Sequence, residues 1–189
     1  MPNEFERTTA ETSVRVSFET EPGTPSIKTP CGFFSHMLEL LGANMGWSLS
    51  IEASGREGED LHHIVEDVGI ALGRALFSWY PSSPRARYGW CALPMDGSLA
   101  LISVDLSGRG GCYFRGSFPS ERCGDLDLEL VPEFFSALAR ESRTTIHARL
   151  LEADNSHHAA EALFKATGRA FAQAFIPSQT SSSTKGVWP

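Results

Sequence analysis

The sequence predicts an α/β sandwich in which a sheet layer is covered by a helical layer, built from two copies of a strand–strand–helix–strand–helix unit. A repeated segment is the main observation. The stretches 62–76 and 157–171 both begin H-H-x-x-E, lie 95 residues apart and match at seven of fifteen positions without a gap. The triplet F-F-S also occurs twice, at 33–35 and 134–136. Such self-similarity indicates an internal duplication.

The first copy follows from the pattern between residues 13 and 80. The segment 13–19 alternates apolar and polar side chains, and 47–53 does so again, so both are expected to be strands. Residues 21–30 hold three prolines and a glycine and are expected to be turns. Helices are expected over 33–41, and from His62 to near Trp79.

The second copy repeats this order. We expect strands at 88–95 and 99–106 around a turn at Asp96–Gly97, then a helix, a strand and the second His-His helix: 134–140, 144–151 and from 157 onward. The F-F-S match places Ala137 opposite His36. The P-S-S-P segment at 81–84 is expected to separate one half, 1–83, from the other, 84–189, within one compact unit.

The repeated H-H-x-x-E motif predicts metal binding. On a helix, neighbouring side chains point about 100° apart, so two adjacent histidines serve different centres, while the glutamate shares a face with the pair. A lone His-His pair is most often an ordinary surface or core feature. Here two copies take up four of the six histidines, and imidazole is the commonest metal ligand. The six are His36, His62, His63, His147, His157 and His158.

Composition narrows the class of protein. A formal net charge of −7 argues against a general nucleic-acid binder. No signal segment or membrane-length apolar run is present, so we expect a cytoplasmic protein without membrane contact. The four cysteines form no C-x-x-C pair, so the predicted metal site uses nitrogen and oxygen ligands.

A few cations are candidates for binding a phosphate group. Arg87, Arg109 and Lys165 would each alone be ordinary surface charges, but together in an acidic protein they can grip an anion. The tail contains S-T-K-G, in which Ser183 and Lys185 could form a small anion loop. A polar, unstructured end is the alternative for this tail.

These motifs together resemble imidazoleglycerol-phosphate dehydratase. The resemblance rests, in chain order, on F-F-S-H-M-L, H-H-I-V-E-D, P-M-D, D-L-S-G-R, N-S-H-H-A-A-E-A-L-F-K-A and S-T-K-G. It implies duplicated ββαβα halves of the ribosomal protein S5 domain 2-like kind. It also implies a homo-oligomer of twenty-four subunits with active sites at subunit interfaces and two Mn²⁺ per site. The implied metal ligands are His36, His62, His63, Glu66, His147, His157, His158 and Glu161.

The resemblance further implies a reaction: removal of water from D-erythro-imidazole glycerol phosphate to give imidazole acetol phosphate, in histidine biosynthesis. The departing proton has no carbonyl beside it, so the reaction needs an electron sink, and the imidazole ring can serve as one if both its nitrogens bind metals and favour the imidazolate. Glu11, Glu161 and His63 are the implied catalytic residues. The general base stays open among Glu161, Glu11 and a metal-bound water. Glu11 would also contact substrate, with the phosphate at Arg87, Arg109, Lys165, Ser183 and Lys185.

Some positions depart from the family pattern and keep alternatives open. The departures are Ser35, Leu40, Ile64, Gly97 and Asp154, where the family usually has Asp, Gln, Thr, Glu and Glu. They motivate a second hypothesis, a diverged dinuclear-metal lyase acting on another phosphorylated small molecule. A non-catalytic metal-binding protein is a third, against which the retained phosphate-binding residues argue.

Overall fold

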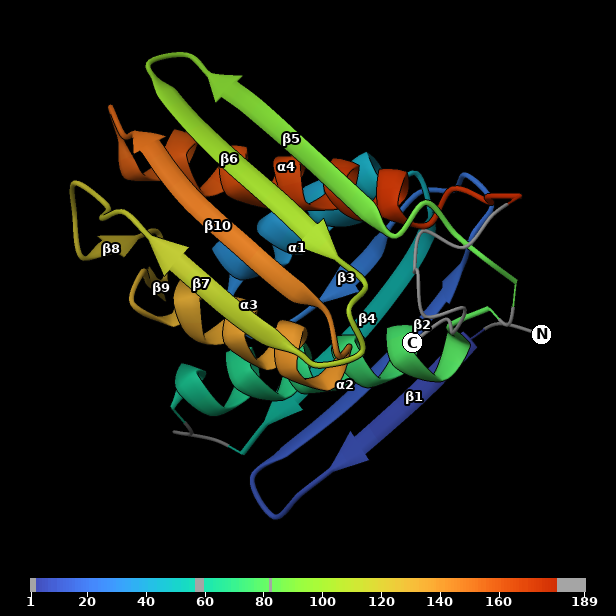
Figure 1. The fold of residues 1–189 in the computed structure, drawn as a ribbon. Helices are drawn as coiled ribbons and strands as arrows, with labels where there is room; N and C mark the ends of the chain where they lie inside the picture. Colours follow the sequence, from blue (N-terminus) through green and yellow to red (C-terminus); the bar gives the residue numbers. More distant parts are fainter. Residues whose placement is uncertain (1–2, 57–59, 82, 180–189) are drawn as a thin grey trace.

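The computed structural model describes residues 3–56, 60–81 and 83–179 as two four-stranded sheets with the helices between them (Figure 1). The first half contains β1 (Asn3–Thr8), β2 (Thr12–Glu19), β3 (Ser26–Lys28), α1 (Gly32–Met45), β4 (Ser48–Gly55) and α2 (Leu61–Trp79). The second contains β5 (Tyr88–Met95), β6 (Ser98–Asp105), β7 (Gly111–Arg115), β8 (Arg122–Cys123), β9 (Leu126–Asp127), α3 (Leu130–Glu141), β10 (Thr145–Glu152) and α4 (Ser156–Ala174).

The two halves have the same topology. Their sheets have the strand orders β1-β2-β4-β3 and β5-β6-β10-β7, in which equivalent strands occupy equivalent places. The predicted α/β class and the duplication are therefore confirmed. Each half is a sheet layer on a helix layer, as predicted. The whole chain, however, is not one sheet under one helical layer, because the halves stack through their helices, α1 on α4 and α2 on α3.

Five of the described strands were not predicted from the sequence. Three of them, β1, β3 and β7, lie at the edges of the four-stranded sheets, and the other two, β8 and β9, are short and pair with each other. The segment 21–30, predicted to be turns throughout, contains β3, which pairs in parallel with β4 over only three residues. Edge strands are short and carry few buried side chains, so they show weak periodicity. The repeating unit was predicted to have two strands before its first helix, but the first half has three, and the second half has three in its main sheet followed by the short pair β8 and β9.

The F-F-S match gave the wrong register between α1 and α3. Gly73 on α2 approaches the backbone of Leu138 and Ser142, and Gly168 on α4 approaches that of Leu41 and Met45. Leu138 and Leu41 are 97 residues apart in the sequence, and so are Ser142 and Met45. The ends of the two helices support the same offset. Gly46 after α1 and Arg143 after α3 are also 97 residues apart, and both have a positive φ, 73° and 52°. His36 on α1 therefore corresponds to Glu133 on α3, and not to Ala137.

The core lies between the sheets and is rich in aromatic side chains. Phe134 on α3 contacts both Phe34 on α1 and Phe164 on α4, which joins three helices. At the other end, Trp47 and Trp79 pack with Phe175. None of the described helices is long and apolar enough to cross a membrane.

Candidate metal centre

Two histidines and a glutamate from two helices form a compact group of possible metal ligands. His36 Nε2 on α1 lies 3.1 Å from Glu161 Oε1, and His157 Nε2 on α4 lies 3.0 Å from the same oxygen. The ligand atoms all lie within 4.8 Å of one another. His157 and Glu161 are one helical turn apart, so α4 presents both on one face. The packing of α1 on α4 brings His36 to them.

Lys165 completes the surroundings of Glu161. Its Nζ donates to Glu161 Oε2 at 2.6 Å and lies 3.5 Å from Met95 Sδ. Burial by itself would raise the pKa of Glu161, but hydrogen bonds from Lys165, His36 and His157 outweigh it and lower the pKa to about 2. Glu161 is therefore an anion. Lys165, predicted to grip phosphate, contacts this carboxylate here.

The donor set fits a first-row dication. Two imidazoles and one carboxylate without a thiolate suit manganese, iron, cobalt, nickel or zinc. Glu161 is 7 % exposed while His36 and His157 are more open to solvent, so the group has a buried anionic base and an accessible side. Three of the eight predicted ligands thus come together within the chain.

Adjacent histidines diverge in both copies of the motif, as predicted. The rings of His62 and His63 are 6.0 Å apart and inclined by 88°, and those of His157 and His158 are 6.0 Å apart and inclined by 87°. Asp60 and Asn155 cap the two helices by accepting the backbone N–H groups of His62 and His158. The copies therefore have the same local geometry because their helices begin in the same way.

The second histidine of each pair lies near a carboxylate from the first hairpin of its half. His63 Nδ1 is 3.6 Å from Glu11 Oε2, and His158 Nδ1 is 3.3 Å from Asp96 Oδ2, although the latter nitrogen is also hydrogen-bonded to Asn155 Nδ2 at 2.8 Å. Glu11 lies in the β1–β2 turn and Asp96 in the β5–β6 turn. A carboxylate beside Nδ1 orients a histidine that binds metal through Nε2. No role was predicted for Asp96 from the sequence, although its place in the equivalent hairpin could have suggested one.

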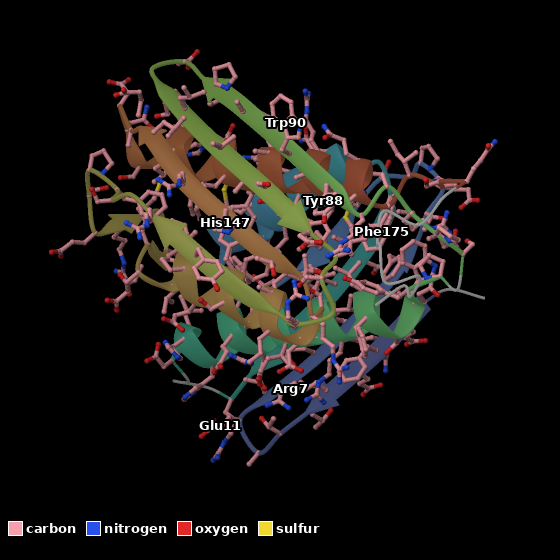
Figure 2. All side chains as sticks on the ribbon, in the orientation of Figure 1. Arg7, Glu11, Tyr88, Trp90, His147 and Phe175 are labelled. Carbon is pink, nitrogen blue, oxygen red and sulfur yellow. The ribbon has the colours of Figure 1, made fainter. Side chains whose placement is uncertain are left out.

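His147, also predicted to be a metal ligand, lies apart from this group. It is on the outer face of β10, between the buried Ile146 and Ala148, and its ring stacks on Tyr113 with centroids 4.7 Å apart. Figure 2 shows it on the sheet surface facing away from the helices.

Glu133 is a residue that the sequence analysis missed. It corresponds to His36 in the register of the two helix pairs, and it stands exposed in the first turn of α3. Because the α1–α4 and α2–α3 contacts are equivalent, the register assigns Glu133 the position on α3 that His36 has on α1, opposite the helix that carries Glu66. Glu66 is 3.5 Å from Arg140 Nη2 on the same neighbouring helix. An alignment of α1 with α3 at an offset of 97 residues would have pointed to Glu133, but the F-F-S match suggested a different offset.

The remaining predicted phosphate contacts are only partly described. Arg87, whose φ is 72°, forms two hydrogen bonds to Asp105, at 2.7 and 3.3 Å. Arg109 follows β6, and its backbone N–H donates to Ser107 Oγ. Neither arginine is in the metal group. Ser183 and Lys185 lie outside the described residues.

The departures from the family pattern have local explanations. A Cβ added at Gly97 would lie 2.8 Å from the Cβ of Asp154. The two positions are therefore neighbours, and the space between them does not hold a larger pair of side chains. Ser35 Oγ bonds Thr29 and thereby joins the start of α1 to the preceding loop. Ile64 is 2 % exposed in the core, and Leu40 packs against the core from α1.

Comparisons with known proteins identify a family for this chain. The family model described as imidazoleglycerol-phosphate dehydratase matches residues 29–171. The proteins of that name from Bacillus cereus strain G9842 and from Caldivirga maquilingensis are each 45% identical over 170 residues, which is 89% of this chain and 88% of theirs.

Solved structures match over nearly the whole chain. The imidazoleglycerol-phosphate dehydratase of Staphylococcus aureus gives a TM-score of 0.85 at 37% identity, over 94% of this chain and 100% of that one. The Pyrococcus furiosus enzyme in complex with (S)-C348 gives 0.86 at 36% identity, over 97% and 99%. The family model covers most of the chain, and these relatives span it almost end to end. The chain belongs to the imidazoleglycerol-phosphate dehydratase family.

Proposed function

We propose that this protein is a metal-dependent dehydratase that converts D-erythro-imidazole glycerol phosphate to imidazole acetol phosphate and water in the cytoplasmic synthesis of histidine. The group formed by His36, His157 and Glu161 is the observation that carries the proposal, because it offers a dication nitrogen and carboxylate donors with an open side. The identity of the substrate is inferred from the family to which the chain belongs.

We further propose two Mn²⁺ per active site, one for each copy of the motif. The duplicated helix register supports a second half-site on α2 and α3 that resembles the first. Its members would be His62, Glu66 and Glu133. Glu133 replaces His147 in the proposed ligand set, because His147 stacks on Tyr113 on the outer sheet face. Two dications would favour the imidazolate form of the substrate ring, which provides the electron sink that the reaction needs.

The chain's own residues hold and orient these groups. Glu161 stays ionised because Lys165 and two imidazoles bond to it. Glu11 would orient His63 through its Nδ1 atom, whereas His158 Nδ1 is held by a hydrogen bond from Asn155 Nδ2 with Asp96 nearby. Glu11 is also positioned at an exposed hairpin turn where it can contact substrate. Arg87, Arg109 and the tail residues Ser183 and Lys185 remain the proposed phosphate contacts.

The divergence of adjacent histidines supports an active site shared between subunits. Within one chain His157 faces Glu161 while His158 points elsewhere, and the two pairs have the same geometry. A second copy of the chain is then the natural source of the ligands that each half-site lacks. A closed homo-oligomer of twenty-four subunits, in which the halves 1–83 and 84–189 act as one unit, meets this requirement.

The test is a dehydratase assay on protein stripped with chelator and reloaded with Mn²⁺. Activity with imidazole glycerol phosphate should be lost on stripping and restored on reloading. His157→Ala should abolish activity and bind less metal per chain. Lys28→Gln, at a side chain that is 81 % exposed, is the matched control and should behave as wild type. Metal-loaded wild-type protein that does not turn over this substrate would refute the proposal.

A further inference from the structure

Asp67 is a buried carboxylate on α2 to which neither the metal group nor the phosphate contacts assign a role. It is 7 % exposed. Its Oδ1 accepts a hydrogen bond from Arg7 Nε at 2.7 Å, and its Oδ2 accepts a short one from the Thr12 hydroxyl. Arg7 is near the end of β1 and Thr12 begins β2. One carboxylate thus ties both strands of the β1–β2 hairpin to α2.

The turn of this hairpin carries Glu11. Thr9 Oγ1 accepts the backbone N–H groups of Glu11 and Thr12 at 3.1 and 3.0 Å, which closes the turn. The carbonyl of Glu11 accepts Arg56 N–H at 3.0 Å. Figure 2 shows Arg7 and Glu11 on this hairpin. The turn is therefore ordered between the two residues that Asp67 holds.

The helix places the hairpin anchor beside the proposed site. His63 and Asp67 are one turn apart and share the face of α2 that packs on the hairpin. Asp67 contacts the strands on both sides of the turn, and His63 faces Glu11 at its tip with 3.6 Å between Nδ1 and Oε2. The distance from Glu11 to His63 therefore depends on where Asp67 holds the hairpin.

The fold by itself does not require a charge here. A buried carboxylate is costly unless it is fully paired, and an apolar side chain often packs equally well. The equivalent position in the second half, 95 residues on, is the buried alanine Ala162, and that half forms the same topology. The carboxylate thus occurs only in the half whose hairpin carries Glu11.

We propose that Asp67, together with Arg7, is a positioning residue that holds Glu11 against His63 and so sets the geometry of the first half-site. This inference rests on the proposed function, in which Glu11 and His63 take part. Asp67 touches neither metal nor substrate and acts through Glu11.

A double-mutant cycle between Asp67 and Glu11 tests the proposal. Asp67→Asn keeps the shape and removes the charge, and it should lower kcat/KM at least tenfold in the wild-type background. In a Glu11→Gln background the same change should have no further effect, because there is no Glu11 carboxylate left to position. Glu6→Gln is the matched control on the same hairpin. It removes the partner of an exposed arginine, Arg15, and should leave kcat/KM unchanged.

Readouts that need no activity separate this proposal from the proposed function. Hydrogen exchange at residues 9–12 should rise in Asp67→Asn and not in Glu6→Gln. The ¹⁵N shifts of the His63 ring should change alike in Asp67→Asn and Glu11→Gln, without adding in the double variant. If Asp67→Asn does not fold, Arg7→Gln removes the same ion pair at a side chain that is 30 % exposed and takes its place in the cycle.

The outcomes are distinct. Effects of Asp67→Asn and Glu11→Gln that multiply in kcat/KM, or add in the His63 shifts, would make Asp67 a structural residue and overturn the inference. Unchanged hydrogen exchange at the turn would do the same. Wild-type protein without dehydratase activity would instead refute the proposed function, and the exchange and ring shifts would still decide whether Asp67 positions Glu11.

Discussion

The contact between α1 and α4 that forms the metal group depends on the absence of a side chain at Gly168. A Cβ there would lie 2.4 Å from Leu41 O and 2.8 Å from Met45 N. Real Cβ contacts stay above 3.0 Å, so Gly168→Ala must move α1 away from α4 by about 0.6 Å. Both contacted atoms belong to the backbone and cannot swing aside, and a gap of this size forfeits roughly a quarter or more of the dispersion energy across it.

The expected magnitude follows from two opposing effects. Overpacking costs about 1–3 kcal/mol, and backbone contacts place Gly168→Ala near the upper end. Replacing glycine by alanine inside a helix returns about 1 kcal/mol. The free energy of unfolding should therefore fall by about 2 kcal/mol, which corresponds to a Tm roughly 4–8 °C lower for a chain of this size. Because His36 moves with α1, the affinity for Mn²⁺ should fall as well.

Chemical denaturation of metal-free protein at fixed concentration measures the first effect, and calorimetric titration with Mn²⁺ measures the second. Gly32→Ala is the matched control, since the nearest atom to its Cβ is Asp125 Oδ2 at 3.5 Å, and its stability should stay within about 0.5 kcal/mol. Gly168→Ala protein as stable as wild type would show that the helices are not held at this distance by the glycine.

Three further predictions concern separate features. Glu133→Gln should reduce the metal bound per chain, measured by elemental analysis, whereas His147→Ala should not; the reverse pattern would restore His147 as the ligand. Asp125→Ala should destabilise the chain by roughly 1–2 kcal/mol at pH 7, because the carboxylate accepts Gly32 and Phe33 N–H at the start of α1. Burial would raise the pKa of Asp125, but these hydrogen bonds outweigh it and lower the pKa. The carboxylate therefore stabilises the fold fully above pH 3.8, and the difference in stability between wild type and Asp125→Ala should narrow below that pH. Burial and the bond to Asp125 raise the pKa of Cys31 to about 12, so this fully buried thiol should resist maleimide at pH 8 until the protein unfolds; rapid labelling of the native state would contradict this.

The sequence was most informative where chemistry restricts residue type. Few roles other than metal binding require H-H-x-x-E twice, so the motif predicted the possible ligands on α4 that the structure groups with His36, and the divergence of the adjacent rings. It was least informative at the sheet edges. β3 lies in a segment with three prolines and pairs over three residues, so neither composition nor alternation could reveal it.

Helix register was misread for a physical reason. The F-F-S triplets align α1 with α3 by identical residues. The helices correspond instead by which positions are buried, whatever residue type fills them. With the offset of 97, the buried Met37, Leu38 and Leu41 correspond to the buried Phe134, Phe135 and Leu138. The apolar face needs volume in those positions and accepts different side chains that supply it. Contact residues that are defined by packing between helices could therefore not be read from short identities.

The corrected register changes how the duplicated chain is understood as a metal protein. Each half contributes one His-His helix, and the other half contributes the residue that faces it: His36 faces α4, and Glu133 has the equivalent place facing α2. The halves are therefore interdependent, since neither helix pair can form within one half alone. The two facing residues also differ, imidazole in one case and carboxylate in the other. In the proposed second half-site, Glu133 and Glu66 would together supply more negative charge than the first half-site has, so the second should bind a dication more tightly. Loading should then be stepwise, and titration of metal-free Glu133→Gln with Mn²⁺ should bring the affinities of the two sites closer together.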